Sequence, residues 1–363
     1  MTETQKTIQK KTAFALGGLA GNNAHGAGFL QAALETGKKP DLISCTSGQI
    51  YWVYNYLNAL NHQKKSSKKN DTASAEKDPL RLLLQKDIIN TPAGPLDLIN
   101  RMMLGMHGKI EPDFLNYTKE FAMNSWSLVL KNLAHPTALN TLSDFYHLFP
   151  SRWLAPRYTK EFYSKISTCF MEEQHIGIFF NSYNPTDGYE TIYTNQAGKK
   201  VIENNGCTGE KQITYEDITP QAVKDALKLY EYGFDKKTGL NVDGEYFRPI
   251  ILRELLTVDD IFVVKPCNTK WIGNLPTTSV ELADLKTEVG INAIYRAEKS
   301  NIELINHLIQ KGYLNHVKKY HTVTIHEVEV QSQEGFDDYA IEDLYLFDNA
   351  RAMGEQLLAQ AKV

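Results

Sequence analysis

The sequence predicts an α/β fold with a mostly parallel central sheet and a helical insertion. A short apolar run at 12–16 leads through a glycine-rich segment into residues 29–34, whose apolar positions have helical spacing. A second apolar run at 42–45 precedes another helical pattern between Ile50 and Leu60. Strand, helix and strand in this order form a βαβ unit, whose strands are parallel and whose crossover is right-handed.

Composition limits the classes of function. The chain has 363 residues, is 42% hydrophobic and 23% charged, and can bury a sizeable core. Its net charge of -4 gives no sign of nucleic-acid binding. The four cysteines are scattered without metal-ligand spacing, so we expect no metal, no cofactor and a reducing compartment.

The N-terminal residues and the lengths of the apolar runs indicate where the protein is located. Residues 1–11 are polar and lysine-rich, so we expect a cytoplasmic protein, or one exported without a cleavable signal peptide. No run of 18 apolar residues occurs, so any membrane contact is expected to be peripheral.

The glycine-rich segment between Gly17 and Gly28 opens the first predicted helix, where free backbone N–H groups can bind an anion. It matches neither the phosphate-binding loop nor the dinucleotide-binding fingerprint. This favours a transient oxyanion over a nucleotide as the anion, as acyl transfer requires.

Thr46-Ser47-Gly48 separates the second predicted strand from its helix. A serine at such an abrupt turn has the layout of a nucleophile elbow, in which the hydroxyl stands clear of the sheet. Cys45 and Gln49 occupy the outer glycine positions of the usual G-x-S-x-G pattern. Because Ser-Gly is also an ordinary helix N-cap pair, the residues alone leave both interpretations open.

An insertion is predicted at 61–150. Its first part, 61–79, is polar and lysine-rich and is expected to be a surface loop that could contact anionic lipid headgroups. The remainder is helical, broken by prolines and rich in Met, Leu and aromatic residues. It forms either a small subdomain with its own core or a lid over an apolar substrate groove. We expect 1–363 to form a single domain around it.

The sheet is expected to resume at 176–180 and 189–194, joined by a β-turn at Asp187-Gly188. Residues 195–216 are polar and are expected to form a loop. A helix should then begin after Thr219, its N-cap, with Pro220 in the first turn.

A second Asp-Gly pair, Asp243-Gly244, precedes a buried strand predicted at 260–265. It could be only a turn, but its position makes Asp243 a candidate partner for Ser47. A mostly helical 279–319, a strand at 322–330 and a final helix complete the prediction.

Four segments, in this order, resemble motifs of the patatin-like phospholipase family. They are the glycine loop and first helix at 16–32, the Pro-Asp-Leu-Ile to Thr-Ser stretch at 40–47, Ile-Thr-Pro-Gln-Ala-Val at 218–223, and Val-Asp-Gly at 242–244. The resemblance covers mainly 12–60 and 176–265.

The resemblance implies a three-layer α/β/α fold and a serine lipolytic acyl hydrolase of the phospholipase A or lysophospholipase kind, with a lipid or acyl ester as substrate. Ser47 would be the nucleophile, and Asp243 the base that accepts its proton. The oxyanion would bind backbone N–H groups, which the resemblance places at Gly18, Leu19, Ala20, Gly21 and Gly48.

Departures from the family motifs leave alternatives open. The family's loop carries a third consecutive glycine and an Arg or Lys, and in this sequence Leu19, Ala20 and Asn22 fall near those positions. The bulky Gln49 stands where the family's elbow has a small residue. A second interpretation is therefore a weakly active or inactive relative that binds a lipid or a protein partner.

A third interpretation is a Ser-His-Asp hydrolase, since His321 and His326 follow Asp243 in the expected chain order. His25 is interpreted as a packing residue. Cys45 is a remote candidate nucleophile, because it falls within the strand before the turn.

Overall fold

The computed structural model describes residues 10–18, 23–69, 78–89, 110–134, 147–205, 212–234, 239–272, 274–314, 321–329 and 344–360. Its strands are β1 (Thr12–Leu16), β2 (Leu42–Cys45), β3 (Ile110–Pro112), β4 (Leu154–Pro156), β5 (Gly177–Asn184), β6 (Tyr189–Thr194), β7 (Ile213–Asp217), β8 (Val242–Asp243), β9 (Asp260–Val264) and β10 (Thr324–Val328). Its α-helices are α1 (Ala24–Thr36), α2 (Gln49–Lys69), α3 (Pro79–Ile89), α5 (Phe114–Ala134), α7 (Lys160–Glu172), α8 (Gln196–Asn205), α9 (Pro220–Ala226), α10 (Ser279–Gln310) and α12 (Leu344–Gln360). Three 3-10 turns are η1 (Tyr230–Tyr232), η2 (Gly244–Tyr246) and η3 (Arg253–Leu255).

The central sheet, within the described residues, has eight strands in the order β10-β9-β1-β2-β5-β6-β7, with β8 also paired to β5. The strands from β10 to β5 are parallel to their neighbours, whereas β6 and β8 run antiparallel to β5. β7 is parallel to β6. The predicted α/β fold with a mostly parallel sheet is therefore confirmed.

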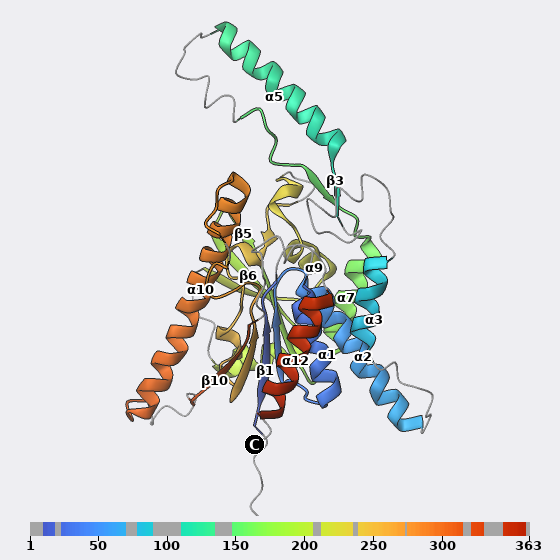
Figure 1. The fold of residues 1–363 in the computed structure, drawn as a ribbon, viewed down its shortest axis with the longest axis vertical. Helices are drawn as coiled ribbons and strands as arrows, with labels where there is room; N and C mark the ends of the chain where they lie inside the picture. The colour runs from blue at the N-terminus through green and yellow to red at the C-terminus, as the bar shows by residue number, and fades with distance from the viewer. Residues whose placement is uncertain are drawn as a thin grey trace, which may run out of the picture.

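Both faces of the sheet are covered by helices, as the alternation along β1 shows. Phe14 and Leu16 point into a core formed with α1, α2, α3, α7, α9 and α12, while Ala13 and Ala15 point into a second core with α8, α10 and the segment around η3. Figure 1 shows α10 on one side of the strands and α1, α2 and α12 on the other. This is the expected three-layer α/β/α arrangement.

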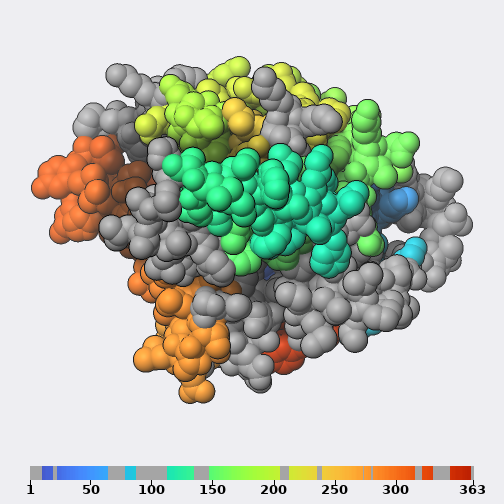
Figure 2. All heavy atoms as spheres, turned by 90° about the horizontal axis from the view of Figure 1, so that it is seen from above, coloured from blue at the N-terminus to red at the C-terminus, as the bar shows by residue number. Residues whose placement is uncertain are grey.

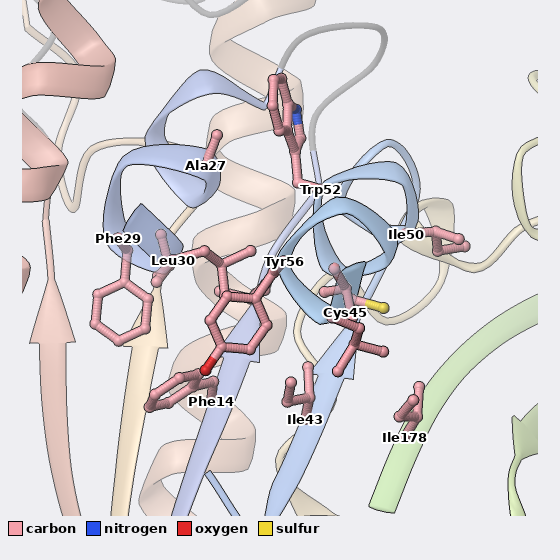
Figure 3. Close-up of a cluster of buried hydrophobic side chains, with 14 of the residues drawn as sticks. Phe14, Ala27, Phe29, Leu30, Ile43, Cys45, Ile50, Trp52, Tyr56 and Ile178 are labelled. Carbon is pink, nitrogen blue, oxygen red and sulfur yellow. The ribbon is translucent and has the colours of Figure 1, made fainter. Parts of the chain in front are cut away.

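The first core is built on the βαβ unit that the sequence predicts. Phe14 of β1 packs edge-on against Phe29 of α1, with ring centroids 4.9 Å apart. Trp52 and Tyr56 of α2 are buried in the same cluster, which Figure 3 shows between the helices and the strands. The buried faces of α1 and α2 therefore fix the ends of β1 and β2, where the glycine segment and Ser47 lie.

Several predicted boundaries are confirmed. Gly37 ends α1 with a positive φ of 68°. Gly188, with a φ of 76°, forms the turn of the β5–β6 hairpin. Thr219 caps α9, because its side chain accepts a hydrogen bond from the Ala222 N–H.

Two predicted loops contain regular structure. Residues 61–69 continue α2 as a helix, because the buried first half nucleates it and polar residues with good helix propensity extend it. The segment 195–216 includes α8 and the edge strand β7, which is stabilised by pairing with β6. Short polar elements of this kind lack a strong hydrophobic period, so only their tertiary partners reveal them.

The predicted insertion divides into unlike parts. Leu80 and Leu84 of α3 are buried in the first core, whereas α5 has no buried residue. A small antiparallel sheet of β3 and β4 lies at the base of α5. Parts of the predicted loop and insertion, at 70–77, 90–109 and 135–146, lie outside the described residues. Among the helices described, none is both long enough and apolar enough to cross a bilayer.

We expect Gly28→Ala to lower the free energy of unfolding by about 1–3 kcal/mol. A Cβ atom on Gly28 would lie 2.1 Å from the carbonyl oxygen of Phe347 in α12, so the two helices would have to separate. Gly290→Ala in α10 is the control, because its Cβ would meet nothing within 4 Å. Urea denaturation should show destabilisation only for Gly28→Ala; equal stability of both variants would contradict this account of the α1–α12 contact.

Candidate active site

Ser47 is the middle residue of the three, Thr46 to Gly48, that join β2 to α2. Its φ of 52° makes it the only non-glycine residue with a positive φ among those described. Such a conformation is strained for a residue with a Cβ atom, and it is the geometry that a nucleophile elbow requires. The side chain is 1% exposed. An ordinary helix N-cap does not need a positive φ, so the backbone at Ser47 has the geometry of an elbow.

Thr46 joins three segments of the chain at this turn. Its Oγ1 accepts a hydrogen bond from the Gly18 N–H at 2.7 Å and donates one to the Pro249 carbonyl at 2.8 Å. Its backbone N–H donates to Leu16 O at 3.1 Å. The start of the glycine segment, the elbow and the chain after Asp243 are thereby held together.

Asp243 ends the short strand β8, which pairs with β5, and it is 0% exposed. Its Oδ1 accepts a hydrogen bond from the Glu245 N–H at 3.0 Å and so caps the turn η2. Its Oδ2 is buried and has no partner at ordinary hydrogen-bond geometry. A carboxylate that served only as a cap would not need this burial.

Ser47 and Asp243 lie together, although 196 positions separate them in the chain. Burial raises the pKa of Asp243 to about 7, and hydrogen bonding by the Ser47 hydroxyl and the Glu245 N–H partly opposes the increase. The Ser47 hydroxyl is therefore close enough to lower the pKa of the Asp243 carboxyl, although Oδ2 has no partner at ordinary hydrogen-bond geometry. Catalytic hydrogen bonds are often long without substrate.

The predicted oxyanion donors have different environments. The Gly18 N–H is committed to Thr46 Oγ1, so in this conformation it is not free to bind an oxyanion, and this corrects our expectation. Leu19, Ala20 and Gly21 lie outside the described residues. For Gly48, no described residue accepts its N–H, which is at the start of α2, directly after Ser47.

Gln49, which the sequence makes the most difficult residue to place, packs against α1. It is fully buried, and a Cβ atom on Gly26 would lie 2.0 Å from its Oε1. The absence of a side chain at Gly26 therefore accommodates the bulk that the usual motif avoids at position 49. Its Nε2 donates weakly to Asn23 O, at 3.5 Å.

A buried charge cluster around Arg248 anchors the segment 244–249, which follows Asp243 in the chain. The Arg248 guanidinium pairs with Glu190 at 2.9 Å, with Glu254 at 3.0 Å and with Glu298 at 3.4 Å. Burial raises the pKa of Glu190 and that of Glu298, the latter to about 7. The cluster therefore carries less negative charge near neutral pH than three ionised carboxylates would.

Asn181 of β5 connects this cluster to the turn. Its Nδ2 donates to Glu190 Oε1 at 2.7 Å and to the Arg248 carbonyl at 3.3 Å. A Cβ atom on Gly244 would lie 2.1 Å from Asn181 Oδ1, so the position after Asp243 requires glycine. Sequence reasoning missed Thr46, Asn181 and Arg248, because their roles depend on residues distant in the chain.

The other candidate nucleophiles and bases are engaged elsewhere. His321 Nε2 contacts Val258 O at 2.8 Å, and His326 Nε2 contacts Asp260 Oδ1 at 2.8 Å. Burial lowers the pKa of His25 to about 4, so it is neutral at pH 7. Burial also raises the pKa of the Cys45 thiol far above its usual range, which opposes a thiolate nucleophile.

Two of the surface cavities that described residues line contain neither Ser47 nor Asp243 in their walls. One, of about 760 Å³, lies between α2 and α7 and has a polar wall; the other, of about 420 Å³, lies beside Arg248 and Glu190. In the described part of the chain, no group of His, Cys, Asp and Glu side chains could hold a metal ion.

Comparison with known proteins gives no match from which an argument can be drawn. No protein-family model matches the sequence, and a search of curated proteins gives no match. Among solved structures, the chain is similar to VipD from Legionella pneumophila, with 13% identity over 97% of this chain and 67% of VipD. The TM-score is 0.29, which is too low to support any conclusion about function.

Because Ser47 has a positive φ, we expect Ser47→Gly to be more stable than Ser47→Ala. Glycine relieves the left-handed conformation, and its greater freedom in the unfolded chain offsets part of this, so the difference should be up to about 1 kcal/mol. Paired urea denaturation curves measure it. A Ser47→Gly variant less stable than Ser47→Ala would contradict the elbow geometry.

Proposed function

We propose that the protein is a serine acyl-ester hydrolase acting on lipid esters, with Ser47 as nucleophile and Asp243 as general base. One observation carries this proposal. A strained serine at a strand-to-helix turn faces a fully buried carboxylate whose Oδ2 has no other partner at ordinary geometry. Strain and buried, unsatisfied charge are both destabilising, and they are concentrated at the two residues that the chemistry would need.

The reaction would proceed in two steps. Ser47 Oγ attacks the ester carbonyl carbon while Asp243 accepts its proton, and the Gly48 N–H stabilises the oxyanion. The intermediate collapses to an acyl-serine, and Asp243 returns the proton to the departing alcohol. Water then attacks the acyl-serine while Asp243 accepts a proton from the water. The bond between the acyl carbon and Ser47 Oγ breaks, Asp243 returns that proton to Ser47 Oγ, and the fatty acid is released.

The lipid nature of the substrate rests on the family resemblance of the four sequence motifs. Ser47 is 1% exposed, so substrate access requires displacement of the residues around it. Lipid or detergent should therefore be present in any assay. The alternative function is binding of a lipid or protein partner without hydrolysis, which the committed Gly18 N–H favours.

The direct test compares the native protein with Ser47→Ala on an acyl p-nitrophenyl ester in mixed micelles. We expect Ser47→Ala to lose activity by about 10³-fold or more, because no attacking group remains. A fluorophosphonate probe should label the native protein and not Ser47→Ala. Ser167→Ala, which removes a serine in α7, is the matched control and should be labelled like the native protein.

Equal hydrolysis by the native protein and Ser47→Ala would exclude Ser47 as the nucleophile. Absence of both labelling and hydrolysis in the native protein, in buffer and in micelles, would favour the alternative of binding without catalysis.

The pH dependence tests Asp243 separately. Only the ionised carboxylate can accept the Ser47 proton, so kcat/KM should rise as pH increases through about 7 and level off above it. The pKa is raised on folding, so stability due to Asp243 should fall as pH rises from the unfolded value, near 4, to about 7.

Asp243→Asn removes both effects. It should abolish hydrolysis and raise stability relative to the native protein more at pH 8 than at pH 5, because the amide carries no charge to bury. A variant that is destabilised most at pH 8 would show that the folded protein favours the ionised carboxylate, contrary to this account.

A further inference from the structure

Helix α5 directs its apolar face toward solvent, whereas a helix that covers a core directs that face inward. None of its residues is buried, and large apolar side chains on it are exposed to solvent. Figure 1 shows α5 projecting from the end of the molecule, and Figure 2 shows it on the surface in the view from above.

The exposed apolar residues lie on one face. At 100° per residue, an outer stripe of α5 consists of Leu115, Lys119, Ala122, Met123, Trp126, Val129, Leu130 and Leu133. Leu115 is 83% exposed, Trp126 67% and Leu133 76%. Within this described helix, the only charged residue of the outer stripe is Lys119.

The opposite face of α5 makes the contacts with the rest of the protein. Phe121 packs against Phe149, with ring centroids 6.0 Å apart, and Asn124 Nδ2 donates to Leu148 O at 3.4 Å. The helix is therefore held by a mixed polar and aromatic face, and its more continuous apolar face is directed outward. A continuous exposed apolar face of this kind marks an interaction surface.

Charge around α5 identifies the kind of surface it fits. Residues 113–134 and the segment 147–157, which contacts α5 and its base, contain four Lys or Arg and two Asp or Glu, a net charge of +2 in a chain whose net charge is -4. Trp126, which is 67% exposed, lies in the outer stripe itself, and Trp side chains favour the membrane–water interface. Apolar and aromatic side chains with nearby cations are the combination that binds the interface of an anionic bilayer.

We propose that the outer stripe of α5 docks the protein on an anionic lipid surface, with its axis in the plane of the interface. The apolar side chains enter the acyl boundary, and Lys119 extends its ammonium toward the headgroups. Docking does not depend on hydrolysis, so the inference goes beyond the proposed function and can be tested independently of it.

The base of α5 is connected to the candidate active site by a chain of hydrogen bonds. Asp113 N–H donates to Trp153 O at 2.8 Å, and Trp153 N–H donates to Glu231 O at 3.1 Å. The Glu231 carboxylate accepts a hydrogen bond from the Tyr246 hydroxyl at 3.3 Å. Tyr246 lies three residues after Asp243 in the chain. A membrane bound by α5 would therefore face the end of the molecule that carries Ser47 and Asp243.

The experiment is flotation of the full chain with phosphatidylcholine vesicles, with and without phosphatidylserine. We expect the protein to float with the vesicles that contain phosphatidylserine. The double variant Trp126→Glu/Leu130→Glu should have at least about tenfold lower affinity for these vesicles, because two large apolar side chains no longer enter the bilayer. Trp126→Phe should retain binding.

The matched control is Val289→Glu/Leu304→Glu on α10, where the two side chains are 59% and 56% exposed. It adds the same charge, so it should float like the native protein. Circular dichroism confirms that each variant is folded. The native and Ser47→Ala proteins should float equally, which separates docking from catalysis.

Three results would overturn the proposal. The native protein could remain unbound at every phosphatidylserine content, the α5 variant could float as well as the native protein, or the α10 control could lose binding equally. A native dimer in buffer that becomes monomeric in the α5 variant would show instead that the outer stripe contacts a second copy of the chain.

Discussion

The hydroxyl of Thr46 is the contact on which the candidate site depends. It accepts from the Gly18 N–H and donates to the Pro249 carbonyl, so one side chain sets the distance between the glycine segment, the elbow and the chain after Asp243. The parallel pairing of β1 and β2 brings these segments to the same edge of the sheet. The same contact withdraws the Gly18 N–H from any oxyanion, so a rearrangement that freed it would also loosen the link to Pro249.

Two buried charged groups near this site differ in how well they are paired: Arg248 has partners, whereas one oxygen of Asp243 has none. Arg248 pairs with three carboxylates, and its carbonyl accepts a hydrogen bond from Asn181, so these contacts anchor the loop that follows Asp243. Asp243, by contrast, is buried with an unsatisfied oxygen and a pKa raised to about 7. Folding therefore stabilises the scaffold while placing a destabilising charge at the point where a base would act, as expected where stability and function compete.

The same contrast appears between the body of the protein and α5. Helices α1, α2 and α12 bury their apolar faces against the sheet, whereas α5 directs its apolar face outward and is held by Phe121 and Asn124. The net positive charge of 113–134 and 147–157 is opposite in sign to that of the whole chain. Hydrophobicity and charge therefore both distinguish this end of the molecule.

The sequence by itself determined the α/β class, the βαβ unit and the hairpin at Gly188, because these follow from local periodicity and turn chemistry. It also identified Ser47 and Asp243 as a pair worth examining. The helix 61–69, α8 and β7 escaped prediction because polar elements gain their stability from neighbours. Only the tertiary structure decided that Gly26 accommodates Gln49, that Thr46 occupies the Gly18 N–H, and that Asp243 is buried beside Ser47. These contacts join residues far apart in the chain, so no local pattern encodes them.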